Sequence, residues 1–164
     1  MPVENVNVFE DDFWAISELL NQLLRNTNSN CVLLIDKAGQ LITSAGDTTK
    51  LDTTSFASLS AADFAATSQL ASLVGEKEFS TLFHQGEREN IYVASIEARV
   101  MLAVIFDQRT TLGLVRVRVK KTVEDLGKLF NNIFAKLEGQ AKPEAKLGAE
   151  FTSEAESELD QLFR

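Results

Sequence analysis

The residue types that do chemistry in proteins are scarce in this chain and stand apart from one another. His84 is the only histidine and Cys31 the only cysteine. A metal site or an acid–base pair needs several such groups together, so we expect His84 to make only a hydrogen bond at a turn or sheet edge. One cysteine cannot form an internal disulfide. The sequence therefore predicts no metal, no cofactor and no catalytic nucleophile.

Motifs of known catalytic sites are missing as well. The chain has no Gly-x-Gly-x-x-Gly and no Gly-x-Ser-x-Gly, and the stretch from Gly46 to Lys50 lacks the second glycine of a Walker A loop. Scattered carboxylates could still meet in space as an acid and a base, and sequence spacing leaves that open. The pattern favours a protein that binds a partner over an enzyme.

Composition limits the partners. With 164 residues, 45% of them hydrophobic and eleven of them Phe, the chain suits one domain with an appendage. The net charge of −8 repels nucleic acid and anionic membranes. No apolar run reaches the roughly 20 residues that span a bilayer, and the start does not resemble a secretion signal. We expect a cytoplasmic protein.

Hydrophobic periodicity predicts the order α-β-β-α-β-β-β-α. The first helix is expected over residues 9–26, with the acids Glu10 to Asp12 at its start. Gly39 supplies the positive φ for a hairpin over residues 31–45. The remaining elements are a helix at 54–74, strands at 79–84, 90–96 and 100–106, and a helix at 112–137. The strand at 79–84 is expected at an edge, and the strand at 100–106, apolar on both faces, in the centre of a sheet.

The helix at 54–74 has two contrasting sides. One carries larger apolar residues with Ala62 and Ala66 between them: Phe56, Leu59, Leu70, Leu73 and Val74. The other carries small or polar residues: Ala61, Ala65, Ser68, Gln69 and Ser72. Small side chains let another backbone approach closely. This second side is therefore a candidate partner-binding surface, although packing against the chain's own sheet explains its composition equally well.

The segment from 112 to 137 has two periods. Leu114 to Lys120 alternates like a strand, but apolar residues keep helical spacing through Leu137, and the longer period favours a helix. Its basic residues Arg116, Arg118, Lys120 and Lys121 lack interleaved aromatics, so a solvated helix face is favoured over a site for an anionic partner.

The C-terminal part changes character. Residues 138–150 are rich in Gly, Ala, Lys and Glu and include Pro143, which predicts a flexible linker between a domain at 1–137 and a tail at 151–164. In the tail, Ser153 and Glu156 form a capping box ahead of Leu159, Leu162 and Phe163 at helical spacing. Such a peptide is too short to be a stable helix alone, so it is predicted to fold on a partner, the alternative being a disordered acidic end.

Several stretches together resemble the Roadblock/dynein light chain superfamily, and within it the MglB branch of bacterial polarity regulators. They are Leu33-Leu-Ile-Asp-Lys-Ala-Gly-Gln-Leu-Ile42, Asp52-Thr-Thr-Ser-Phe-Ala-Ser-Leu59, Phe83-His-Gln-Gly86, Val104-Ile-Phe-Asp-Gln-Arg-Thr-Thr-Leu-Gly-Leu-Val-Arg116 and the tail ending Leu159-Asp-Gln-Leu-Phe163. The resemblance implies an α+β Roadblock fold: a five-stranded antiparallel sheet in the order 2-1-5-4-3, with the helix at 54–74 on one face and the other two helices on the opposite face.

The resemblance also implies a function. Members of this branch form homodimers through the third strand and the second helix, and two protomers hold one GTP-bound Ras-like GTPase of the MglA type and accelerate its hydrolysis. The implied partner-binding residues are Ala61, Ala65, Ser68, Gln69 and Ser72, with Leu159, Leu162 and Phe163 of the tail as a second contact. Other polarity proteins are further candidate partners, and concentration at a cell pole is implied.

Many activators of GTPases insert an arginine beside the nucleotide. The candidates here are Arg88, Arg99 and Arg109, of which Arg109 is the best placed by its loop. Loop arginines usually pair with nearby carboxylates, however. The branch is instead expected to remodel the GTPase so that the GTPase's own catalytic residues act. Two alternatives are a dimeric scaffold without effect on hydrolysis and a PAS-like sensor, which would need several short helices where one long helix is expected.

Overall fold

The computed structural model describes the backbone of residues 2–162 and the side chains of residues 10–139 and 161–162. The described chain has the predicted order of elements. They are α1 (Pro2–Thr27), β1 (Cys31–Asp36), β2 (Leu41–Gly46), α2 (Thr53–Leu73), β3 (Thr81–Gln85), β4 (Asn90–Ile96), β5 (Val100–Phe106) and α3 (Leu112–Leu162). The chain forms two compact units, residues 1–127 and residues 128–164. No helix among the described residues is long and apolar enough to cross a membrane.

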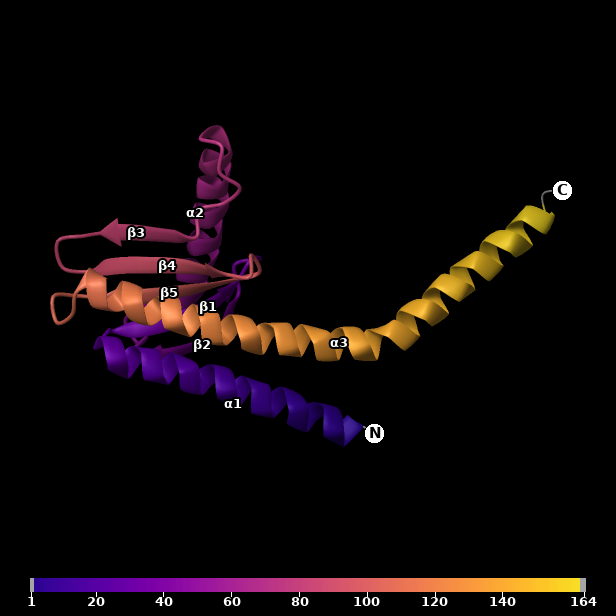
Figure 1. Ribbon diagram of the computed structural model, residues 1–164, viewed down its shortest axis with the longest axis horizontal. Coiled ribbons are helices and arrows are strands. Elements are labelled where there is room, and N and C mark those ends of the chain that lie inside the picture. Colours follow the sequence, from indigo (N-terminus) through magenta and orange to yellow (C-terminus); the bar gives the residue numbers. More distant parts are fainter. Residues whose placement is uncertain (1, 163–164) are drawn as a thin grey trace. The chain divides into compact units, whose positions relative to one another are not determined.

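The five strands form one antiparallel sheet in the order β2-β1-β5-β4-β3. Within the first unit, α2 crosses one face of this sheet, and α1 and the start of α3 lie on the other face (Figure 1). The architecture implied by the resemblance is confirmed. The central place of β5 and the edge position of β3 are confirmed too, since β5 pairs with both β1 and β4 and is buried along almost its whole length.

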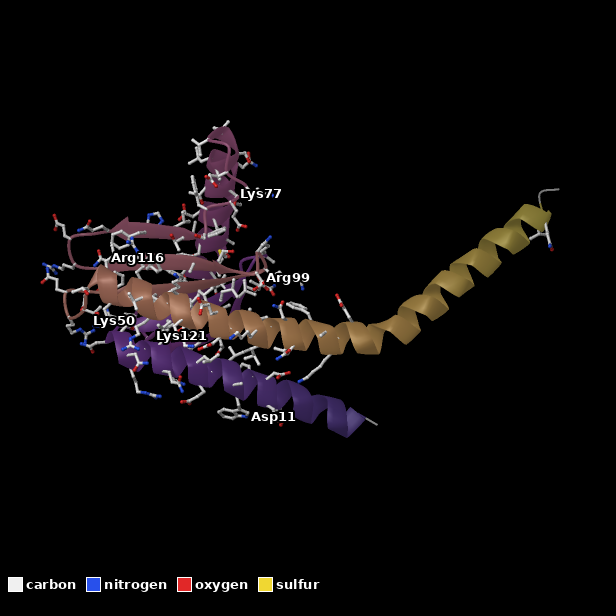
Figure 2. The ribbon with its side chains drawn as sticks, viewed as in Figure 1. Asp11, Lys50, Lys77, Arg99, Arg116 and Lys121 are labelled. Atoms are coloured by element: carbon white, nitrogen blue, oxygen red, sulfur yellow. The ribbon has the colours of Figure 1, made fainter. Side chains whose placement is uncertain are left out.

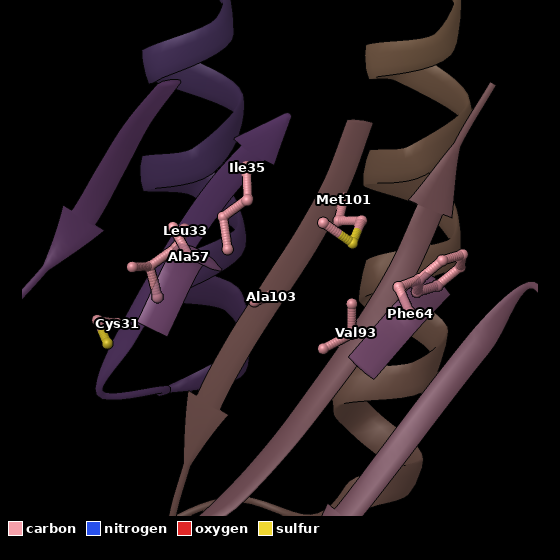
Figure 3. Close-up of a cluster of buried hydrophobic side chains, with 8 residues drawn as sticks. All are labelled: Cys31, Leu33, Ile35, Ala57, Phe64, Val93, Met101 and Ala103. Carbon is pink, nitrogen blue, oxygen red and sulfur yellow. The ribbon is translucent and has the colours of Figure 1, made fainter. Parts of the chain in front are cut away.

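The core under α2 follows from the alternation of side chains along the strands. Every second residue of β1, β4 and β5 faces α2, where these residues pack with Ala57 and Phe64 (Figure 3). Their neighbours in sequence, such as Val32, Leu34 and Leu102, are fully buried as well. The inner strands are thus covered on both faces, which explains their nearly continuous apolar sequences.

The first helix begins earlier than predicted. It starts at Pro2, so the acids Glu10 to Asp12 lie inside the helix and do not mark its start. Its end at Thr27 is within one residue of the predicted bound. Asn28 adopts a left-handed φ of 50°, and the Thr27 hydroxyl donates to the carbonyl oxygen of Leu23 over 2.6 Å. Short polar side chains such as Asn tolerate this conformation, which ends the helix.

Helix α2 does not bury the side that carries most of its larger apolar residues. Its buried residues are Ala57, Phe64 and Ala71, and Phe56 and Ala61 also pack on the core. The side with the larger apolar residues is largely exposed: Leu59 is 69%, Leu70 55%, Leu73 82% and Val74 70% accessible. The helix is apolar on most of its circumference, so periodicity alone could not select the buried side.

The third helix confirms the longer of the two periods at 112–137. Val115, Val119 and Leu126 are buried in the first unit at helical spacing. The helix then continues through residues 138–150, including Pro143, where the sequence predicted a flexible linker. The structure therefore differs from the expected irregular conformation of that segment. The division into domain, linker and tail stays a prediction.

Candidate protein interface

The small-residue side of α2 borders a groove. Ala61, Phe64, Ala65 and Ser68 form one wall of this groove, which we call the α2 groove and which encloses about 320 Å³. The β4–β5 hairpin and two loops supply the rest of the lining: Lys37, Lys77, Glu78, Ser95, Ala98, Val100 and Met101. Lys77 is labelled beside α2 in Figure 2. The groove has an apolar floor with charged groups at its rim.

The serines of this helix hydrogen-bond to the helix itself. Ser68 Oγ donates to the carbonyl oxygen of Phe64 over 3.0 Å, and Ser72 Oγ donates to that of Ser68 over 3.4 Å. Hydroxyls that bond one turn back have their proton already engaged. The surface they present to a partner is consequently small and weakly polar, which suits close approach of another backbone.

Two tight turns shape the groove. In the β1–β2 turn, Gly39 has a φ of +86°, and a Cβ there would lie 3.0 Å from the Cα of Ser58 in α2. In the β4–β5 turn, Glu97 and Ala98 both have positive φ, at 52° and 54°. This conformation costs a residue with a side chain about 1–2 kcal/mol. The strained backbone of this tight hairpin lies at the groove through Ala98.

A second surface lies on the exposed apolar side of α2. Leu59, Ala62, Ala66, Leu70 and Leu73 follow one another at helical spacing, and all are exposed. We call this set the leucine stripe. Beside it, His84 of β3 lies 2.7 Å from Asp63 of α2, between Nε2 and Oδ2. This hydrogen bond ties the edge strand to the helix, which is the role expected for His84.

Arg109 is held in place by its own loop. Its Nε donates to both carboxylate oxygens of Asp107, over 3.0 and 3.2 Å, and an Nη donates to the side-chain oxygen of Asn30. These contacts with the guanidinium lower the pKa of Asp107 and raise that of Arg109. The arrangement is the local pairing that is common for loop arginines.

Cys31 is buried in the sheet and its thiol is held in the neutral form. Burial, reinforced by the negative charges of Glu89 and Asp47, raises the pKa of the Cys31 thiol to about 11, so the thiolate form is rare at neutral pH. No group of three or more His, Cys, Asp or Glu residues suited to a metal ion occurs in the part of the chain whose side chains are described.

The structure brings together part of the predicted partner-binding set. Ala61, Ala65 and Ser68 line the α2 groove, Gln69 and Ser72 are exposed outside its lining, and Ala61 also packs partly on the core. Leu162 is 80% exposed, and the side chains of Leu159 and Phe163 lie outside the described residues. No sequence pattern predicted the part of the lining that comes from turns and from the β4–β5 hairpin.

Known proteins share this architecture. The Roadblock/LC7 domain family matches residues 15–106. A search of curated proteins gives no significant match. Among solved structures, Myxococcus xanthus MglB is 48% identical with a TM-score of 0.71, over 73% of this chain and 90% of that one. The gliding protein MglB from Thermus thermophilus is 31% identical with a TM-score of 0.69, over 72% and 90%.

A third solved structure, described as MglB with a tetrameric arrangement, is also 31% identical, with a TM-score of 0.69 over 72% of this chain and 89% of that one. The family match covers more than half of the residues, and both the sheet order and the long α2 agree with it. The alternative of a PAS-like sensor is not supported, because one unbroken helix joins β2 and β3 where such a sensor would need several short helices. The chain belongs to the Roadblock/LC7 family, and it is similar to the MglB proteins of that family.

Proposed function

We propose that this protein is a GTPase-activating regulator of a small Ras-like GTPase of the MglA type, acting in cell polarity and gliding motility. The similarity to MglB proteins, one of them named a gliding protein, supports this proposal. The protein acts in the cytoplasm and concentrates at a cell pole. It has no active site of its own and acts only through the GTPase.

The α2 groove is the observation that carries the proposal. Ala61, Ala65 and Ser68, three of the five residues implied by the family resemblance, border this one groove. Its apolar floor and small side chains fit a flat or convex protein segment better than a metabolite, which needs convergent polar groups. The GTPase therefore docks along α2, with Gln69 and Ser72 beyond the groove as further contacts. Leu159, Leu162 and Phe163 of the tail supply a second contact.

The protein acts as a homodimer in this proposal. The leucine stripe leaves large apolar side chains of α2 exposed, and β3 is the edge strand beside it. Exposed apolar patches and free strand edges are features that proteins commonly bury in assemblies. A similar MglB has a tetrameric arrangement, which supports an assembly of more than one copy.

Activation occurs without a catalytic arginine from this chain. Arg109 would have to leave Asp107 and Asn30 before it could reach a nucleotide. Binding energy is instead used to select the GTPase conformation whose own residues are aligned for hydrolysis. The alternative, a scaffold that binds the GTPase without changing its turnover, predicts complex formation at an unchanged rate.

The test is a single-turnover assay of phosphate release from a purified GTP-loaded MglA-type GTPase, with and without this protein. Faster release supports an activator, binding without acceleration supports the scaffold, and no binding contradicts both. Ala65→Arg places a long charged side chain at the groove and should abolish binding. Ala135→Arg, at an exposed helical alanine of α3 outside the groove lining, is the matched control and should bind normally.

Arg109→Ala tests the mechanism. If the GTPase supplies all of the catalytic groups, stimulated hydrolysis should change less than about tenfold in this variant. A catalytic arginine is worth about a thousandfold or more. A loss of that size, with binding retained in a pull-down or by interferometry, would show that Arg109 takes part in the reaction.

A further inference from the structure

The helical layer on the face opposite α2 carries large apolar side chains that are exposed. On α1, Trp14 is 69% and Phe13 45% exposed, and their rings lie edge to face with centroids 6.5 Å apart. On α3, Val117 is 66% and Leu114 39% exposed. Large exposed aromatic groups are uncommon on a surface that stays in water, and Trp is enriched in interfaces.

Charges of opposite sign accompany the two apolar patches. Glu10 and Asp11 precede Phe13 and Trp14 on α1, and all four are exposed. Arg116 and Lys120 flank Val117 on α3 and are exposed too. None of these four charged side chains forms an ion pair with another described residue. The layer therefore has an acidic aromatic end and a basic aliphatic end.

The two ends are arranged so that a second copy fits them. The helices α1 and α3 run in opposite directions within the first unit, so Asp11 and Arg116 lie toward opposite ends of the layer (Figures 1 and 2). A two-fold axis that lies between the two stacked layers, perpendicular to the line joining the acidic and basic ends, brings the acidic end of each copy onto the basic end of the other. Both contacts are then attractive, whereas a parallel stacking of the layers would oppose like charges.

We propose that the outer face of α1 and α3 is a self-association surface, on which a second copy of this chain packs with Trp14 and Phe13 against Leu114 and Val117. The contact lies on the sheet face opposite α2. It leaves both the α2 groove and the leucine stripe open, so it does not depend on the proposed function. It would join copies, or dimers formed through α2, into larger assemblies.

Charge reversal tests this contact with a built-in rescue. One variant carries Arg116→Glu with Lys120→Glu, and a second carries Glu10→Lys with Asp11→Lys. Each should self-associate at least about tenfold more weakly than the wild type in sedimentation velocity, because both symmetric contacts become repulsive. An equimolar mixture of the two variants should associate as the wild type does, since all of its contacts are attractive again. A chain with all four changes should also recover.

Trp14 gives a local readout, because it is the only tryptophan in the chain. Its emission should shift to shorter wavelength as the wild-type concentration rises, and the shift should weaken at about 0.5 M salt. This signal separates the contact from any association through α2. Lys50→Glu, an exposed reversal in the loop before α2, is the control and should behave as the wild type.

The proposal is wrong if Trp14 emission does not depend on concentration while the protein associates. It is also wrong if either reversed variant associates as tightly as the wild type, or if the mixture of folded variants fails to recover. Circular dichroism of each variant shows whether it is folded, and recovery in the mixture or in the fourfold variant excludes misfolding as the cause of weaker association.

Discussion

At the scale of single residues, one carboxylate determines how α2 begins. Asp52 accepts hydrogen bonds from the backbone N–H of Ser55 over 3.1 Å and from its hydroxyl over 2.7 Å. These bonds, first the one from the Ser55 side chain, lower the pKa of Asp52. An acid at this position satisfies a backbone donor that has no partner inside the helix. The groove-forming helix thus starts at a titratable group.

The sign of the pH effect follows from this lowered pKa. A carboxylate whose pKa is lower in the folded than in the unfolded state stabilises the protein above about pH 4 and loses that contribution as the pH falls further. We expect Asp52→Ala to lower the urea midpoint at pH 7, and the difference from the wild type to shrink toward pH 3. Asp52→Asn should keep most of the cap without the titration. Identical pH dependence in wild type and Asp52→Asn would contradict this assignment.

At the scale of elements, the β1–β2 turn and α2 fit together through a missing side chain. Gly39 is buried against α2, where a Cβ would meet Ser58 and Ala61. Both the positive φ and the close contact favour glycine at this position, and together they let the hairpin lie directly against the helix. The turn therefore helps to fix the position of the part of α2 that borders the groove.

Replacing this glycine should be costly. We expect Gly39→Ala to reduce the free energy of unfolding by about 1–2 kcal/mol from the backbone conformation alone, with a further loss from the contact with α2. Gly113→Ala is the matched control: it lies in the first turn of α3, and a Cβ there meets nothing within 4 Å. In a helix this change should be neutral or stabilising by up to about 1 kcal/mol. Chemical denaturation measures both, and equal effects would refute the special role of Gly39.

The elements also show which features of the fold can be predicted from the sequence and which cannot. The bounds of β4 and β5 were predicted correctly, because continuous apolar runs between turn residues have few other interpretations. The sequence left open which side of α2 is buried, because Ala57, Phe64 and Ala71 are outnumbered by larger apolar residues that stay exposed. Which side of α2 is buried depends on how closely the sheet approaches the helix, and hydrophobic periodicity carries no information about that distance. The α2 groove is formed by α2 together with turns that are distant from it in sequence, so only the wall formed by α2 could be predicted.

At the scale of the whole molecule, the sheet separates two surfaces of different chemistry. On the α2 side, the leucine stripe is apolar and lies beside the edge strand β3. On the other side, α1 and α3 present aromatic, aliphatic and charged groups. Apolar surface drives stable association, whereas complementary charge mainly sets orientation and salt dependence. We therefore expect association through α2 to be the tighter of the two and to persist at high salt.

The variant Leu70→Lys with Leu73→Lys tests this last expectation. Both side chains are more than half exposed in one chain, at 55% and 82%, so the change should leave the free energy of unfolding of a monomer nearly unaltered. Across a symmetric interface it places four cations in contact, which should dissociate the dimer in size-exclusion chromatography with light scattering. GTPase stimulation should fall with it if two protomers are needed. Ile42→Lys, 38% exposed on the opposite edge strand β2, is the control and should stay dimeric. If the lysine pair leaves the mass unchanged while Ile42→Lys halves it, the dimer forms through the β2 edge of the sheet, which contradicts this proposal.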